Sequence, residues 1–220
     1  MEIILTTIYT LAFLLLIYRM KFFRIEGVSR VALAVFFVIK VFCGIALIFI
    51  YSYYYTERTS SDIYNYFDDG NRIYSAIDDN PADYLRMLTG IESDAPHLMK
   101  YYSKTNYWFK DYNYELFNDN RTIIRYNAFV RLFSFGYIEI HTVVMAFLSF
   151  AGLCGILKVF LPFLKNKNHL LVFAVFAFPS VMFWSSGVLK EGLVIFSSGL
   201  FVYAFHRIIN RFSWKYLAVV

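Results

Sequence analysis

The sequence has few charged residues and lacks the features that mark small secreted domains or common enzymes. Of its 220 residues, 17% are charged and 59% are hydrophobic, whereas soluble domains have about 25% charged residues. Two cysteines occur, Cys43 and Cys154, each inside an apolar run without nearby ligands, which excludes a disulfide framework and a zinc site. The sequence contains no glycine-rich phosphate loop, His-Glu-x-x-His pair or nucleophile elbow. The composition therefore predicts an integral membrane protein.

The charges are divided unevenly along the chain. Residues 51–136 contain 12 of the 16 acidic and 9 of the 21 basic residues, a net charge of −3, whereas the rest of the chain carries +8. Ten of the twelve basic residues outside this segment lie beside loops on one side of the predicted spans, as the positive-inside rule requires. The formal net charge of +5 therefore reflects membrane topology, and nucleic acid is not an expected partner.

Five apolar segments predict the fold class: an all-α, polytopic transmembrane helical bundle with a folded extracytoplasmic loop of short amphipathic helices. The segments are residues 3–18, 31–51, 137–160, 170–184 and 188–205, and each approaches the length that crosses roughly 30 Å of hydrocarbon. Basic residues follow the first segment rather than precede it, so it is not a signal peptide.

We expect two transmembrane helices in residues 1–50, the loop in 51–136 and three transmembrane helices in 137–220. The charge pattern places the N-terminus and the loop on the outer side of the membrane. The apolar run at 216–220 suggests the start of a further helix and hence a longer protein.

Local signals predict three short helices within the loop. Ser60 or Ser61 is the expected N-cap of a helix that continues to about residue 77. Asn80 with a following proline marks a second start, and Gly90 marks its end. A third helix, amphipathic and basic, is expected over about 122–135. The loop holds 14 of the 19 tyrosines, which is too aromatic for disorder, so it should fold against the membrane surface.

Candidate chemistry begins with acidic residues in the first loop helix. Asp62, Tyr66 and Asp69 are spaced i, i+4 and i+7, so they share one face of a helix, and Asp68 is adjacent. A carboxylate there can deprotonate a hydroxyl or bind a divalent cation. The alternative is that these acids form only the solvated side of an interfacial helix.

Basic residues form a second candidate group. Residues 178–192, FPSVMFWSSGVLKEG, predict two helices joined by a short outer hairpin, and the proline is expected to bend the first helix. Lys190 and Glu191 then lie at or just under the membrane surface, where they either face a ligand cavity or snorkel outward.

Lys40, nearer the inner end of its span, is expected to snorkel without a role, and His141 is a weak candidate ligand or base. Three arginines suit phosphate recognition or contact with anionic head groups: Arg121, Arg125 and Arg131.

Together these residues resemble a known group of enzymes. An outer Asp-x-x-x-Tyr-x-x-x-Gly helix beginning at Asp62, an arginine-bearing helix leading into a span, and the hairpin at 178–192 resemble GT-C-type glycosyltransferases and the related polymerases of exopolysaccharide and O-antigen. The resemblance implies a polyprenyl-phosphate or polyprenyl-diphosphate sugar as donor and a glycan as acceptor. It implies that Asp62, with Asp68 and Asp69 behind it, is the catalytic or metal-associated acid, and that Lys190 and Arg125 hold the phosphate.

The sequence thus predicts a membrane glycosyltransferase or polysaccharide polymerase. The large loop follows the second span, whereas in GT-C enzymes it usually follows the first, so a polymerase is as good a match as a monosaccharide-transferring enzyme. Aromatic faces suit sugar rings, a carboxylate suits a base, and cations stabilise a departing phosphate. Substrate contacts are expected from Tyr66, Arg121, Arg125, Arg131, Lys190 and Glu191.

Two other classes remain open. In a non-enzymatic subunit or scaffold of an envelope assembly, the loop aromatics should form an exposed docking patch. A transporter needs polar or broken helices near the midplane, and the first, third and fifth predicted spans show no charged residue at mid-depth.

Overall fold

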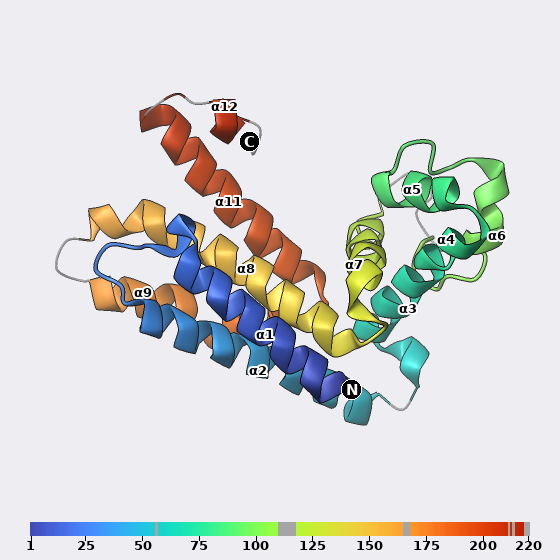
Figure 1. Ribbon diagram of the computed structural model, residues 1–220, viewed down its shortest axis with the longest axis horizontal. Coiled ribbons are helices and arrows are strands. Elements are labelled where there is room, and N and C mark those ends of the chain that lie inside the picture. The colour runs from blue at the N-terminus through green and yellow to red at the C-terminus, as the bar shows by residue number, and fades with distance from the viewer. Residues whose placement is uncertain (56, 110–117, 165–167, 211, 213, 218–220) are drawn as a thin grey trace. The chain divides into compact units, whose positions relative to one another are not determined.

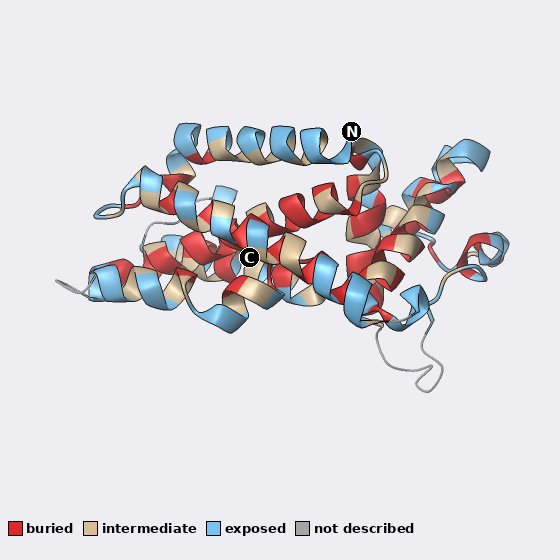
Figure 2. Cartoon of the chain, turned by 90° about the horizontal axis from the view of Figure 1, so that it is seen from below, coloured by how far each residue is buried: buried red, intermediate tan, exposed pale blue. Residues whose placement is uncertain are grey.

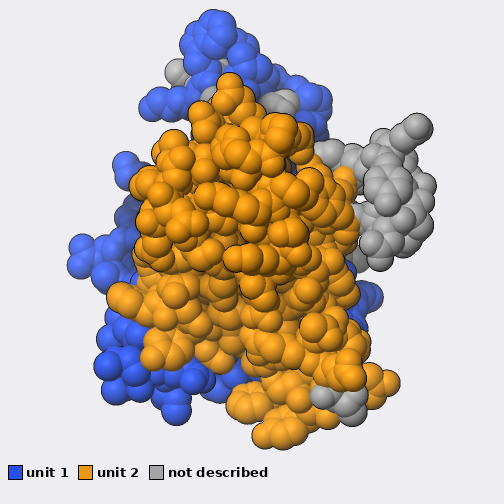
Figure 3. All heavy atoms as spheres, turned by 90° about the vertical axis from the view of Figure 1, so that its right-hand side faces the viewer, with its two compact units in different colours: residues 1–47, 142–187, 191–220 blue, residues 48–141, 188–190 orange. Residues whose placement is uncertain are grey.

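The computed structural model describes all residues except 56, 110–117, 165–167, 211, 213 and 218–220. Every regular element in this described part is helical, which confirms the all-α prediction. The chain divides into two compact units (Figure 3), unit 1 with Met1–Leu47, Thr142–Gly187 and Glu191–Val220, and unit 2 with Ile48–His141 and Val188–Lys190. Of the apolar run at 216–220, residues 218–220 lie outside the described residues, and the short helix α12 covers Trp214–Leu217.

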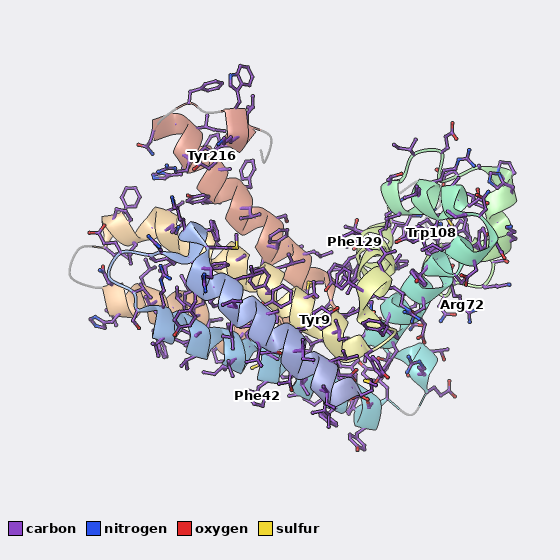
Figure 4. All side chains as sticks on the ribbon, in the orientation of Figure 1. Tyr9, Phe42, Arg72, Trp108, Phe129 and Tyr216 are labelled. Carbon is purple, nitrogen blue, oxygen red and sulfur yellow. The ribbon has the colours of Figure 1, made fainter. Side chains whose placement is uncertain are left out.

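Among the residues that the structure describes, four helices are long and apolar enough to cross a membrane (Figure 1). They are α1 (Glu2–Arg19), α2 (Arg30–Tyr54), α8 (Ile138–Phe160), which the turn η4 (Leu161–Phe163) extends, and α11 (Lys190–Asn210). Figure 2 shows exposed residues along most of α1, and Figure 4 shows Phe42 of α2, which is 70% exposed. Large apolar side chains on the outside of long helices suit contact with lipid rather than water.

The structure divides the predicted span at 170–184 into two short helices. These are α9 (Asn168–Phe176) and α10 (Pro179–Trp184). Proline disfavours helical geometry in the residue before it, and Phe178 is extended, so Pro179 begins a new helix instead of bending a continuous one. With nine residues, α9 is about 13 Å long, which is too short to cross a bilayer.

Phenylalanine rings and glycines shape the core of unit 1. Phe13 of α1 stacks on Phe147 of α8 with ring centroids 4.3 Å apart, and Phe37 and Phe150 are fully buried around them. The helices α8 and α11 touch at glycines, because a Cβ on Gly199 would lie only 2.6 Å from the Cα of the facing glycine of α8. Small residues of this kind let helix backbones approach closely in membranes.

Unit 2 is built mainly from short helices around the pair α3 and α7. Its elements are η2 (Arg58–Ser60), α3 (Asp62–Tyr74), α4 (Ala76–Asp79), α5 (Pro81–Thr89), η3 (Pro96–Leu98), α6 (Met99–Tyr102) and α7 (Asn120–Ser134). Ile63 and Ile73 of α3 and Ile123 of α7 are fully buried between them. A Cβ on Gly70 would lie 3.0 Å from the backbone nitrogen of Ala128, so α3 and α7 are in contact through their backbones at this glycine.

The local signals in the loop predict most of the helix ends correctly. Ser61 occupies the N-cap position of α3 without a capping hydrogen bond from its side chain. Asn80 caps α5 by accepting the backbone N–H of Ala82 at 3.0 Å. Gly90 ends α5 with a φ of 84°, a left-handed conformation that glycine adopts without strain. The expected helix at 122–135 is α7, which starts two residues earlier and ends one residue earlier.

The aromatic residues of the loop form much of the interior of unit 2. Trp108, labelled in Figure 4, is fully buried and stacks on Tyr102 with ring centroids 4.5 Å apart.

Asp83 of α5 is also buried, and its carboxylate bonds to His97 at 3.0 Å and to Arg86 at 3.2 Å. The hydrogen bond from His97 and the nearby Arg86 lower the pKa of Asp83.

Candidate functional site

The predicted face of Asp62, Tyr66 and Asp69 exists, and residues 106 and 107 cover it. Asp69 is fully buried, and its two carboxylate oxygens accept the backbone N–H groups of residues 106 and 107 at 2.8 and 2.7 Å. Burial raises the pKa of Asp69, whereas these two hydrogen bonds act in the opposite direction. Asp69 therefore anchors a distant chain segment on α3.

Asp68 is held in an ion pair with Arg58. Both nitrogens of the arginine fork donate to the carboxylate, Nε to Oδ2 at 2.7 Å and Nη2 to Oδ1 at 2.8 Å. The hydrogen bond to Asp68 raises the pKa of Arg58. The pair connects η2 to α3, so the structure gives Asp68 a positioning contact within unit 2.

Asp62 is the most accessible of the three predicted acids. It is the first residue of α3, it is exposed, and its Oδ1 accepts the hydroxyl of Tyr107 at 3.0 Å. Burial and the hydrogen bond to Asp62 raise the pKa of Tyr107, which keeps the phenol protonated near neutral pH. Within the described residues no lysine or arginine pairs with Asp62.

Lys190 joins the same region from the other end of unit 2. Its Nζ donates to Asp119 Oδ2 at 2.7 Å and to Asn120 Oδ1 at 2.9 Å. The same Asn120 oxygen accepts the hydroxyl of Tyr66 at 3.3 Å, and the ring of Tyr66 lies edge-to-face against Tyr107 at 5.6 Å. A continuous set of contacts therefore connects five residues, here named the Asp62–Lys190 cluster: Asp62, Tyr66, Tyr107, Asn120 and Lys190.

The ion pair within this region is weak enough to exchange partners. The side chains of Lys190 and Asp119 are 34% and 51% exposed, and ion pairs in such surroundings contribute about 0–1 kcal/mol. Tyr66, in contrast, is buried, so its ring supports the cluster and is not a surface for substrate. Sequence reasoning missed Tyr107 and Asn120, which only the tertiary contacts bring to the site.

The three predicted phosphate-binding arginines lie outside the Asp62–Lys190 cluster. Arg125 donates its Nε to the carbonyl of Met87 at 2.9 Å, and burial lowers its pKa. Arg121 donates to the carbonyl of Trp108 at 3.2 Å, and both guanidinium groups lie over the Trp108 ring, at 5.0 and 5.4 Å. Arg131 lies 4.8 Å above the ring of a tyrosine in α3. These contacts stabilise the packing of unit 2 through backbone hydrogen bonds and cation–π interactions.

His141 is buried and bonded through both ring nitrogens. Nδ1 lies 2.7 Å from Asn127 Oδ1, and Nε2 lies 2.8 Å from Ser134 Oγ. Because both ring nitrogens are bonded to the protein, His141 holds α7 against the start of α8. This arrangement favours a structural role for His141 over a role as a ligand or base.

The hairpin at 178–192 differs from the expected outer loop, because its turn is buried inside unit 1. Ser185 and Ser186 have almost no exposed surface, and a Cβ on Gly44 of α2 would lie 2.7 Å from the carbonyl oxygen of Ser186. Ser149 of α8 donates its hydroxyl to the carbonyl of Ser185 at 2.7 Å. Irregular backbone in a membrane protein is tolerated where protein satisfies its polar groups, and the Ser149 hydroxyl does so for the carbonyl of Ser185.

Lys40 does not snorkel, contrary to the sequence expectation. Its side chain is fully buried, and its Nζ donates to Ser185 Oγ at 2.6 Å. No carboxylate pairs with Lys40 in the described part of the chain. The signal that sequence reasoning undervalued is a lone charge ten residues into a 25-residue apolar helix, since intramembrane charges usually have a function.

Glu191 lines a cavity of unit 1 that Ser185 also reaches. The cavity measures about 430 Å³, and Ser180, Trp184 and Ile195 form other parts of its wall. Glu191 itself is exposed. Ser185 therefore lies between the buried amine of Lys40 and an accessible cavity that contains a carboxylate.

The remaining observations concern metals and known proteins. Among the described residues, no three His, Cys, Asp or Glu side chains are grouped as metal ligands would be. No protein-family model, curated protein or solved structure matches this chain. The proposals below therefore rest on the residues of the chain itself.

Proposed function

We propose that this protein is a polytopic membrane glycosyltransferase or polysaccharide polymerase. It uses a polyprenyl-phosphate-linked sugar at the outer face of the bacterial cytoplasmic membrane, and it transfers that sugar to a glycan acceptor. The observation that supports this proposal is the Asp62–Lys190 cluster, in which an exposed carboxylate and an exchangeable amine belong to one set of contacts.

The topology of the proposal follows from charge. The basic residues of unit 1 gather at the loops near residues 19–30 and beyond residue 157, and unit 2 is the acidic part of the chain. The positive-inside rule then assigns those loops to the cytoplasm and unit 2 to the outside. A donor carried by a polyprenyl lipid is available on that outer side only within reach of the bilayer surface.

The chemistry assigns separate tasks to the two ends of the cluster. Asp62 accepts the proton of the attacking acceptor hydroxyl, and Tyr107 holds the Asp62 carboxylate through its own O–H. Lys190 exchanges Asp119 for the phosphate of the donor and neutralises the charge that develops as the phosphate leaves. Tyr66 and Asn120 position Lys190.

The burial of five loop aromatics favours an enzyme over a scaffold. Tyr66, Tyr84, Tyr101, Tyr102 and Trp108 are all buried, whereas Tyr53, Tyr54, Phe109, Phe129 and Phe135 are exposed. A docking surface would present such rings to solvent as a contiguous patch, whereas here the five buried rings form the core that positions the cluster.

A second candidate, a transporter, is favoured by two features of unit 1. Lys40 is a buried intramembrane amine, and the helix over 168–184 is interrupted before Pro179. Broken helices and charged residues near the midplane are typical of transporters. In this candidate, loss of the Lys40 amine abolishes substrate flux, while loss of the Asp62 carboxylate does not.

The experiment is sugar transfer by the purified full chain in nanodiscs. A panel of radiolabelled polyprenyl-diphosphate monosaccharides serves as donors, and label in the glycan acceptor is counted. Asp62→Asn should reduce the rate by about 10²–10⁴-fold, the usual contribution of a general base, and Lys190→Gln should also reduce it. Asp78→Asn, a matched change at an exposed acid of α4, should leave it unchanged. Undiminished transfer by both site variants, or no transfer by the wild-type chain from any donor, would contradict the proposal.

A further inference from the structure

A large pocket in unit 1 is lined by positive charge. It has a volume of about 1060 Å³, slightly above the usual range of small-molecule sites, and its walls come from four places in the chain. These are the loop before α2, the C-terminal end of α8 with η4, the first residue of α9 and the C-terminal part of α11. We call it the basic pocket, and its polar residues are Arg24, Glu26, Lys158, Asn168, His206 and Arg207.

Among the described residues, the cations of the basic pocket have no acidic partner within ion-pair distance. In the described ranges of the chain, no aspartate or glutamate pairs with Arg24, Lys158 or Arg207. Glu26 is the one carboxylate among the pocket residues, and it is exposed, as are Arg24 and Arg207. A pocket with three cations and one carboxylate attracts an anion.

Lys158 is held in place by aromatic rings. Its Nζ lies 4.8 Å from the ring centroid of Phe22 and 5.6 Å from that of Tyr203. The lysine is half-buried, and a cation over ring faces is attracted without being neutralised. The positive charge of Lys158 therefore stays available to a ligand in the pocket.

The other pocket residues supply directed hydrogen-bond donors. Arginine presents a planar fork that binds two oxygens of one phosphate, and Arg24 and Arg207 reach the pocket from separate elements. Asn168 adds a side-chain amide. The loop before α2 packs closely against this amide, since a Cβ on Gly27 would lie 2.9 Å from Asn168 Nδ2. Gly27 also has a φ of 74°, so the loop geometry requires glycine there.

We propose that the basic pocket binds the phosphate group of an anionic ligand. Two guanidinium groups, one ammonium and one amide match the oxygens of a phosphate ester, and the volume accommodates the group that the ester carries. The pocket lies where the basic loops of unit 1 meet, which the positive-inside rule places on the cytoplasmic side. Basic pockets between membrane helices on that side bind lipid phosphates. A lipid head group and a soluble phosphate ester share this chemistry, and the proposal is independent of the Asp62–Lys190 cluster.

The experiment measures phosphate binding by the full chain in phosphatidylcholine nanodiscs. In one arm phosphatidic acid is added to the bilayer and retained lipid is counted by native mass spectrometry. In the other arm glycerol 3-phosphate is titrated and the melting temperature (Tm) is followed. Arg24→Gln combined with Arg207→Gln should weaken binding by about tenfold or more, because each charge-assisted hydrogen bond is strong.

A matched control removes the same charge outside the pocket. Arg19 and Lys21 are exposed and do not line it, so Arg19→Gln combined with Lys21→Gln should retain binding within about twofold. A response to phosphatidic acid alone identifies a lipid head group, and a response in both arms identifies the phosphate ester itself. No response in either arm, or an equal loss in the control, would overturn the proposal. The Tm of each variant without ligand verifies that it is folded.

Discussion

Replacing the buried Lys40 with methionine should make the protein more stable. The side chain of Lys40 is fully buried and donates one hydrogen bond, to Ser185 Oγ. Methionine has a similar length and flexibility without the amine, so it fills the same space in the core. Replacing a residue that serves packing alone lowers the stability of the protein. Replacing a residue that is kept for function at the expense of stability raises the stability.

The magnitude follows from two opposing contributions. Loss of the hydrogen bond between the ammonium and Ser185 costs about 1.5–3 kcal/mol. Removal of a buried ammonium recovers its desolvation penalty, which is several kcal/mol per ion in proteins. The net gain is about 1 kcal/mol, and for a chain of this length that raises the Tm by roughly 2–4 °C.

The assay is thermal unfolding in detergent, followed by tryptophan fluorescence, since Trp184 precedes Ser185. Ser185→Ala is the matched variant, because it removes the partner and leaves the amine buried without a hydrogen bond. It should cost about 1–3 kcal/mol. In the Lys40→Met background the same serine change should cost less than about 0.5 kcal/mol.

The reasoning is refuted by a lower Tm for Lys40→Met. Such a result would mean that the hydrogen bond to Ser185 stabilises the fold by more than the burial of the amine costs. An additive double variant would equally show that the two side chains do not interact in the folded state.

Three further predictions concern packing and pH. Gly199→Ala should lower the Tm by several degrees, because overpacking costs about 1–3 kcal/mol. The control Ser198→Ala, on the exposed side of α11, should leave the Tm unchanged. Equal Tm values for the two variants would contradict the close helix contact. Asp69→Ala should lower the free energy of unfolding by about 2–5 kcal/mol, since it leaves two backbone N–H groups without their acceptor. Trypsin should then cleave the chain near residue 104 faster than in the wild type. Unchanged cleavage would exclude the anchoring role of Asp69. The pKa of Asp83 is lowered in the folded state, so its stabilisation is present above the unfolded-state pKa and is lost as the pH falls below about 4. Asp83→Asn should flatten the Tm profile in that range, and an unaltered profile would assign the acid sensitivity to other groups.

The sequence predicts those parts of the fold that short-range chemistry controls. The cap at Asn80 and the turn at Gly90 depend on side-chain and backbone preferences within a few residues. The shared face of Asp62, Tyr66 and Asp69 follows from the helical repeat alone. These features need no information about the partner surface, and the structure contains each of them.

The features that sequence reasoning missed depend on contacts between distant segments. Residues 106 and 107 cover the acidic face of α3 although they are 37 and 38 residues away from Asp69. The proline at 179 is visible in the sequence, but whether it bends a helix or begins one depends on the geometry of Phe178. The depth of Lys40 in its span can be counted, whereas the direction of its side chain depends on where Ser185 packs.

The partners of each cation decide which of the predicted phosphate-binding residues can act. Arg121 and Arg125 of unit 2 donate to backbone carbonyls and lie over Trp108. Arg121 also pairs with the exposed Asp94 at 3.3 Å, but moving either guanidinium group away from Trp108 would disrupt the core. Lys190 has a solvent-exposed partner that a phosphate can replace at little cost. In unit 1, Lys40 and Lys158 are at least half-buried without a carboxylate partner among the described residues. Lys158 is stabilised by the rings of Phe22 and Tyr203. Because an unpaired cation is most costly inside a membrane protein, stability cannot explain the fully buried Lys40, and function is the physical reason that remains for keeping it.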